Sequence, residues 1–90
     1  MAELKKGTLA LSRAGHDVGT LYVIIDADDT YVYLADGRSR TLDRPKKKKR
    51  KHIQLICRTV DITCTDDAQI RRELKAARKG KERKIYITQQ

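Results

Sequence analysis

The sequence predicts a mainly β fold, a small barrel of five antiparallel strands followed by one C-terminal α-helix. Within residues 7–37, three runs alternate apolar and polar side chains, which is typical of strands with one buried face. Gly15 and Gly19 bound the loop between the first two runs, where glycine permits a sharp bend. The 90 residues include four Tyr but no Trp or Phe. One small core of Leu, Ile and Val must therefore suffice, which suits thin antiparallel sheets.

The three alternating runs define the first three strands, which we expect at residues 8–12, 21–25 and 31–35. The second run carries apolar side chains on both faces, as a central strand does. The polar segment 26–30 is predicted to turn the chain. Asp36 and Gly37 form a strong hairpin signal. We expect them to lead into a short fourth strand at 40–42, which ends before Pro45.

The fifth strand is predicted at residues 52–56, where an apolar pattern resumes after a basic run. Apolar residues share one parity over residues 53–57 and the other parity over residues 60–64. Because side chains alternate strictly along a strand, a bulge, turn or break must lie near Arg58 and Thr59.

A helix is predicted after this break, capped by Thr65 or Asp66. Its basic last turn suits the helix dipole, and Gly80 is the predicted stop. Three apolar residues fall on one helical face, namely Ile70, Leu74 and Ala77. Residues 84–88 are predicted to form a final short strand.

Charge is distributed unevenly along the chain. We assign residues 1–60 to the barrel, with a basic loop at 44–51, and residues 61–90 to the helix and a short tail. Residues 1–43 carry five Lys or Arg against seven Asp or Glu, a net charge of −2, whereas residues 44–90 carry sixteen against five, a net charge of +11. Because self-repulsion destabilises so basic a small domain, this imbalance favours a polyanionic partner, nucleic acid first and an anionic membrane surface second.

Several classes of protein are disfavoured. No apolar run approaches the ~20 residues of a membrane-spanning helix. Residues 1–7 lack the apolar region of a signal peptide, so we expect a cytoplasmic protein. Cys57 and Cys64 are too few for a disulfide framework and lack the spacing of a zinc site. We interpret both as buried small residues, and a metal site that joins them to His16 and His52 is the less favoured alternative.

No constellation of catalytic residues is evident. His16 and Asp17 form a His-Asp pair, but metal-dependent hydrolysis would need further ligands, and only one other His occurs. The sequence also lacks a phosphate-binding Gly-Lys-Ser/Thr loop. We expect a protein that is not an enzyme and that needs no cofactor.

Residues 5–37 resemble the KOW motif of ribosomal proteins and transcription elongation factors. The likeness lies in KKG at 5–7, AGHDVG at 14–19 and an alternating run that ends in ADG at 35–37. The resemblance is strongest to the KOW-bearing large-subunit ribosomal proteins of archaeal and eukaryotic type, where it extends through KHIQL at 51–55 and covers roughly the first two-thirds of the chain. It implies an SH3-like barrel and RNA binding.

The glycine-bounded loop supplies the first set of predicted RNA contacts, which are Arg13, Gly15, His16 and Gly19. In many KOW loops lysines flank the second glycine, but here Val18 precedes it and Thr20 follows it. Asp17 would also oppose a phosphate. We therefore expect weaker phosphate contacts from this loop than the family norm, and a tight turn without a ligand is the alternative interpretation.

Residues 44–51, RPKKKKRK, place seven cations in eight positions. Few acidic residues lie nearby, so we predict a mobile arm that gains phosphate partners and releases counterions on RNA. A solvated loop and a nuclear import signal are the alternatives. The predicted contacts of this segment are Arg44, Lys46, Lys47, Lys48, Lys49, Arg50, Lys51 and His52.

The helix supplies a second predicted basic surface, made of Arg71, Arg72, Lys75, Arg78 and Lys79. A solvated helix face is the alternative. Such contacts would position RNA without reading its bases. Aromatic residues are few, and we interpret Tyr31 and Tyr33 as core residues, so structured RNA is favoured over a single strand.

The leading hypothesis is therefore a ribosomal or ribosome-associated protein that is monomeric when free and binds structured ribosomal RNA, in contact with proteins of the large ribosomal subunit. One alternative is a protein-interaction module of a transcription or ribosome-associated factor. Another is a non-specific DNA-binding protein.

Overall fold

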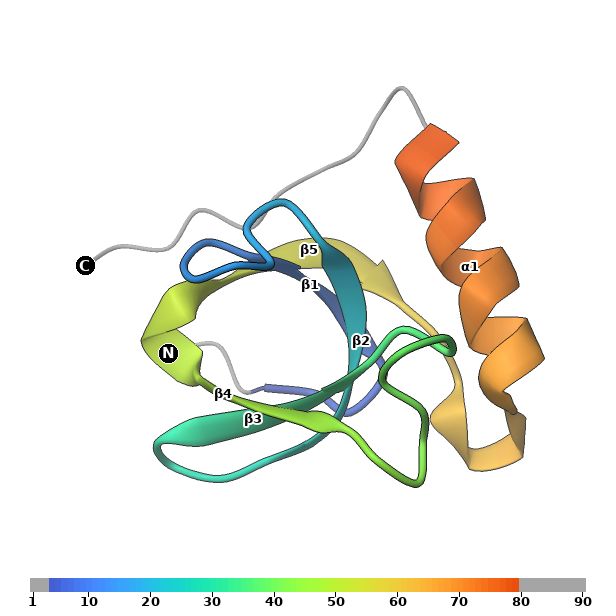
Figure 1. Cartoon of the computed structure of the whole chain (residues 1–90). Helices are drawn as coiled ribbons and strands as arrows, with labels where there is room; N and C mark the ends of the chain where they lie inside the picture. Colours follow the sequence, from blue (N-terminus) through green and yellow to red (C-terminus); the bar gives the residue numbers. More distant parts are fainter. Residues whose placement is uncertain (1–3, 80–90) are drawn as a thin grey trace.

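The computed structural model describes residues 4–79, which form one curled antiparallel sheet with a helix packed beside it (Figure 1). The strands are β1 (Thr8–Ser12), β2 (Leu21–Ala27), β3 (Tyr31–Ala35), β4 (Lys46–Lys49) and β5 (Ile53–Thr59), and the helix is α1 (Asp67–Lys79). Two short 3₁₀ helices are η1 (Arg50–His52) and η2 (Ile62–Cys64). The predicted class is confirmed: a mainly β fold with five antiparallel strands and a C-terminal helix.

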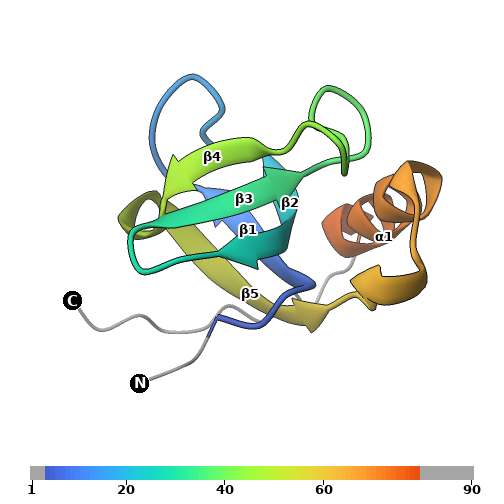
Figure 2. The same ribbon diagram turned by 90° about the horizontal axis from the view of Figure 1, so that it is seen from below.

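The strand order is β4-β3-β2-β1-β5, and η1 joins the two outermost strands. The sheet is therefore barrel-like but not closed by a hydrogen-bonded ladder (Figure 2). The first and third strands have the predicted bounds, and β2 runs two residues further than predicted. As its two apolar faces predict, β2 is central and pairs with both β1 and β3.

Two apolar clusters hold these elements together, one on each face of the strands. The first lies between the sheet and α1 and is built around Leu9, Val23, Ile56, Ile70 and Leu74. The second lies on the other strand face, inside the curl, and contains Ala10, Tyr22, Ile24, Val32 and Leu34. Neighbouring residues of one strand enter different clusters, because successive side chains point to opposite faces of the sheet.

The predicted irregularity after the fifth strand is a β-bulge within β5. Leu9 pairs with Ile56, but Thr8 pairs with Thr59, so Cys57 and Arg58 have no counterparts on β1. A bulge lets the strand bend. Because two residues are inserted, the even-numbered residues stay on one face, and Ile56 and Val60 both adjoin the first cluster. Cys57 is exposed there, so the prediction that it is a buried small residue is wrong.

The fourth strand is not where the sequence analysis put it. Residues 40–42 belong to a loop, in which two backbone N–H groups donate to carboxylate side chains and not to β3. The Arg40 N–H donates to Asp36 Oδ1 at 2.9 Å, and the Leu42 N–H donates to Asp67 Oδ1 at 2.9 Å. Pro45 precedes the actual fourth strand and does not follow it.

This loop is fixed to the start of α1 through Gly37. Its carbonyl accepts a 2.6 Å hydrogen bond from the Arg71 guanidinium. Gly37 has a φ of 77°, in the left-handed region, and a Cβ built there would collide with the Asp67 carbonyl oxygen. Both the backbone conformation and the close approach therefore require glycine.

We predict that Gly37→Ala lowers the free energy of unfolding by about 2 to 3 kcal/mol, because it combines left-handed strain with a backbone collision. Gly19→Ala is the matched control. Gly19 has a φ of 89°, but a Cβ there meets nothing within 4 Å, so we expect a cost of only about 1 kcal/mol. Urea unfolding measures both, and equal costs would contradict the role given to the Asp67 contact.

Helix α1 agrees with its predicted pattern. The Asp66 carboxylate accepts from the Gln69 N–H at 2.8 Å, so Asp66 is the capping residue and Thr65 is not. Ile70, Leu74 and Ala77, which were predicted to share one helical face, are all buried in the cluster between the sheet and α1. Gly80 and residues 84–88 lie outside the described residues. Within residues 4–79, no helix is long and apolar enough to cross a membrane.

Candidate nucleic-acid interface

The glycine-bounded loop between β1 and β2 is a tight turn, as predicted. Gly15 and Gly19 have φ values of 87° and 89°. The Gly19 N–H donates to the Ser12 carbonyl at 3.0 Å, and the Thr20 N–H donates to the Asp17 carbonyl at 2.9 Å. These two amides serve the turn itself and are not available to a phosphate. Val18 lies at the tip, and 61% of its surface is exposed.

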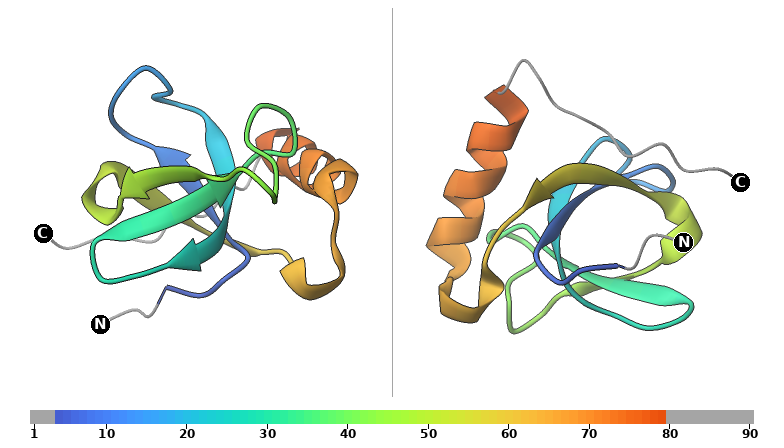
Figure 3. Two further views of the ribbon diagram at one scale, coloured as in Figure 1. Left: turned by 60° about the horizontal axis from the view of Figure 1, so that its bottom comes forward. Right: turned by 180° about the vertical axis from the view of Figure 1, so that it is seen from behind.

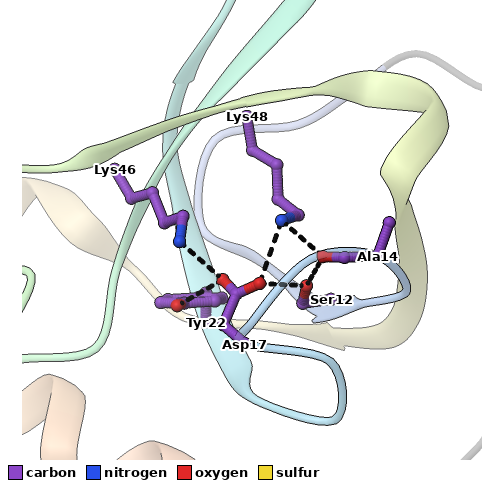
Figure 4. A network of polar contacts seen from close by, with 6 residues as sticks. All are labelled: Ser12, Ala14, Asp17, Tyr22, Lys46 and Lys48. Atoms are coloured by element: carbon purple, nitrogen blue, oxygen red, sulfur yellow. Dashed lines mark hydrogen bonds and ion pairs between the residues drawn. The ribbon is translucent and has the colours of Figure 1, made fainter.

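Asp17 turns inward from this loop and contacts four polar groups (Figure 4). Its carboxylate accepts hydrogen bonds from the hydroxyls of Ser12 and Tyr22, both at 2.8 Å. It also pairs with the ammonium groups of Lys46 and Lys48, each at 3.0 Å. Lys48 donates in addition to the Ala14 carbonyl at 2.8 Å. We call the side chains of Ser12, Asp17, Tyr22, Lys46 and Lys48 the Asp17 cluster.

The Asp17 cluster corrects the expected role of this carboxylate. Only 13% of the Asp17 side chain is exposed, so it does not face a phosphate outside the loop. Burial by itself would raise the pKa of Asp17, but the hydrogen bonds from Lys48, Tyr22, Ser12 and Lys46 outweigh it and hold this pKa well below its usual range. Burial and the bond to Asp17 raise the pKa of Tyr22 above its usual range. The carboxylate is therefore ionised and holds the loop against β4.

The basic run is not a mobile arm or a loop, and that prediction is wrong. Lys46–Lys49 forms β4, which pairs antiparallel with β3 along its whole length. A run of identical lysines shows no alternation in sequence, yet in the strand alternate lysine side chains point to opposite faces of the sheet. Lys46 and Lys48 stand opposite Leu34 and Val32 and point inward to Asp17.

The other two lysines face outward beside the tyrosines of β3. Lys47 pairs with Tyr33, and Lys49 pairs with Tyr31. We call these four residues the outer β3–β4 face; Figure 2 views the strand pair from this side. Both lysines are exposed, and the Lys47 ammonium lies 4.2 Å from the centroid of the Tyr31 ring. Tyr31 and Tyr33 are partly exposed and belong to neither apolar cluster, so their interpretation as core residues is wrong.

The outer β3–β4 face continues into η1. The Arg50 N–H donates to the Thr30 carbonyl at 2.9 Å, and the Arg50 guanidinium donates to the Asp28 carbonyl at 3.1 Å. Lys51 is exposed. Next to it lies a shallow pocket of about 370 Å³, lined by Asp29, Thr30, Lys49, Arg50 and Lys51.

The other residues that were predicted to contact RNA near the glycine-bounded loop and the basic run differ in exposure and in their bonds within the protein. The Arg13 guanidinium donates to the Gln54 side chain at 2.8 Å, and the Arg13 N–H donates to the His52 carbonyl at 2.8 Å. His16 is exposed in the loop, and His52 is half-buried in η1. Arg44 is exposed in the loop that precedes β4.

The basic residues of α1 form a separate surface. Arg71 is held by the Gly37 carbonyl, and Arg72 donates to the Gln69 side chain at 2.9 Å. Lys75 and Arg78 are exposed, and Lys79 ends the helix. In Figures 1 and 3, α1 and η1 lie at opposite ends of the sheet. The structure therefore does not bring the two predicted basic surfaces together.

Among residues 4–79, no group of three or more His, Cys, Asp or Glu side chains is arranged to hold a metal ion. The Asp28 carboxylate, near the outer face, is satisfied locally: it accepts the N–H groups of Tyr31 and Thr30 at 2.7 and 2.9 Å, which lowers its pKa.

In comparisons with known proteins, the sequence matches no protein-family model and no curated protein.

Proposed function

We propose that this protein binds structured RNA through the outer β3–β4 face and η1. The observation that carries the proposal is the sorting of the four lysines of β4, because two are paired with Asp17 and two remain exposed beside Arg50 and Lys51. Four neighbouring cations on rigid elements suit a phosphate backbone, which is recognised by charge and position. The net charge of +9 supports a polyanionic partner in general.

The ribosome is the proposed source of this RNA. The support is the resemblance of the glycine-bounded loop and the KHIQL segment to KOW-bearing ribosomal proteins, together with the barrel-like sheet that presents the cations. The sheet orients the basic residues, and the Asp17 cluster keeps the loop and β4 in one arrangement. In this proposal the α1 surface is a second, independent contact, since it lies at the other end of the sheet.

The first experiment measures affinity for a fluorescein-labelled RNA hairpin at salt concentrations from 50 to 300 mM by fluorescence anisotropy. Four phosphate contacts predict that the logarithm of affinity falls against the logarithm of salt with a slope of about −3. A DNA hairpin of the same sequence is the control, and we expect weaker binding to it. A slope near zero, or a preference for DNA, would contradict the proposed function.

A second experiment addresses the ribosome. We expect the protein to co-sediment with large ribosomal subunits in a density gradient at physiological salt and to be released as the salt is raised. Binding to isolated hairpin RNA without co-sedimentation would support RNA binding and contradict the ribosomal source.

A further inference from the structure

We propose that the outer β3–β4 face is a stacking site for unpaired nucleotides, in which a base lies on the Tyr31 ring and Lys47 and Lys49 hold the adjoining phosphates. This inference rests on the proposed RNA-binding function and names the part of the RNA that this face takes. The phosphates of a duplex would occupy the lysines but would leave both rings unused.

The first argument is the arrangement of rings and charges. Each tyrosine of this face stands directly opposite a lysine, Tyr31 against Lys49 and Tyr33 against Lys47. Residues two apart on one strand are separated by about 6.7 Å, so the two rings are neighbours, as are the two ammonium groups. Single-stranded RNA needs this combination, because bases stack on aromatic rings while cations follow the backbone.

The second argument is that the Tyr31 ring can be reached from solvent. Tyr31 is partly exposed, and the ammonium group of the exposed Lys47 lies over its ring, 4.2 Å from the centroid. An exposed cation–π contact is weaker than base stacking on an aromatic ring. A base can therefore displace this ammonium, which then becomes available to a phosphate next to the base.

The third argument is the space beside the ring. The shallow pocket of about 370 Å³ lies at residues that adjoin Tyr31 and Lys49, and three of its five lining residues are cations. Its carboxylate, Asp29, would repel a phosphate, so we place the phosphate nearest to the pocket at Lys49. The ring and the pocket together give a nucleotide both an apolar surface and a charged one.

The experiment uses two fluorescein-labelled probes, a ten-nucleotide oligouridine, which has little structure of its own, and a blunt-ended RNA duplex, which has no unpaired bases. We expect Tyr31→Leu to weaken oligouridine binding about tenfold, the loss typical of one stacked base. We expect it to change duplex affinity less than twofold, because paired bases cannot stack on the ring. Tyr31→Phe keeps the ring and should bind oligouridine like the wild type. Unlabelled oligouridine should also quench the tyrosine fluorescence of the wild type more than that of Tyr31→Leu.

The outcomes separate this inference from the proposed function. If Tyr31→Leu binds oligouridine as well as the wild type does, while both bind the RNA duplex, the stacking site is overturned and RNA binding stands. If the wild type binds neither RNA, both proposals are overturned. A decaglutamate peptide tests for a protein partner. If Tyr31→Leu loses as much affinity for this peptide as it loses for oligouridine, the ring does not act specifically on bases, and the stacking site is overturned. Matching urea midpoints for the three proteins ensure that folding does not explain the result.

Discussion

Replacing Lys47, Lys49 and Lys51 with Gln is expected to weaken binding to the RNA hairpin by about a hundredfold at 0.15 M salt. Each phosphate contact that is lost removes the release of about 0.7 to 0.9 counterions. Three contacts therefore change the salt slope by about 2 to 3, which corresponds to roughly two decades of affinity at that salt concentration. Anisotropy titrations at several salt concentrations measure both quantities.

The matched control for this triple variant is Arg72→Gln, Lys75→Gln and Arg78→Gln on α1. It removes the same net charge from the opposite end of the sheet. If the outer β3–β4 face and η1 form the main interface, the control should lose far less than a hundredfold. Equal losses in the two triple variants would mean that binding depends on total charge, and the assignment of an interface to β4 and η1 would be wrong.

The Asp17→Asn variant is expected to lose about 2 to 4 kcal/mol of stability at pH 7. The substitution leaves two lysines close together without their shared carboxylate, and one of them, Lys48, has a side chain that is only 9% exposed. Removing one partner of a largely buried ion pair is costly because the other charge stays desolvated. Urea unfolding of wild type and variant gives the difference directly.

The pH dependence of this difference follows from the lowered pKa of Asp17. Its folded pKa lies below the unfolded value of about 3.9. The ionised carboxylate therefore contributes its full stabilisation above about pH 4 and loses it as the pH falls through the folded pKa. We expect the wild-type advantage over Asp17→Asn to shrink as the pH is lowered from 5 to 2. An advantage that stays constant over this range would contradict the role of the ionised carboxylate.

Asp26→Asn is a useful comparison because it removes a carboxylate from an exposed pair. Asp26 lies 3.7 Å from the Lys6 ammonium, and both side chains are more than half exposed. Exposed pairs of this kind contribute little. We expect a change in stability below about 0.5 kcal/mol at every pH. A cost as large as that of Asp17→Asn would imply a general charge effect and not a specific cluster.

The strands that could be predicted are those whose side chains alternate in polarity. The bounds of β3 were predicted correctly because Val32 and Leu34 enter one apolar cluster while their neighbours do not. The fourth strand could not be found in this way. Its four residues are all lysines, and the reason that two of them face inward is an aspartate about thirty residues earlier in the chain. No local pattern records such a partner.

The composition predicted which half of the chain would hold the candidate interface, but not which of its side chains would face solvent. Net charge indicated which half of the chain would meet a polyanion, yet it could not separate Lys47 and Lys49, which face solvent, from Lys46 and Lys48, which face Asp17. The outward position of Tyr31 also escaped prediction. A tyrosine in an alternating strand can lie on either the buried face or the solvent face, and the packing of the neighbouring residues determines which face it takes.

The strand of identical lysines has a further consequence for register. Shifting a strand by one residue normally moves its apolar side chains to the wrong face. A shift of β4 within its four lysines would instead present a chemically equal pair to Asp17 and another equal pair to solvent. The side chains of β4 therefore cannot specify its alignment with β3. That alignment must come from the ends of the strand, from Pro45, which has no N–H to donate, and from the Arg50 N–H bound to the Thr30 carbonyl.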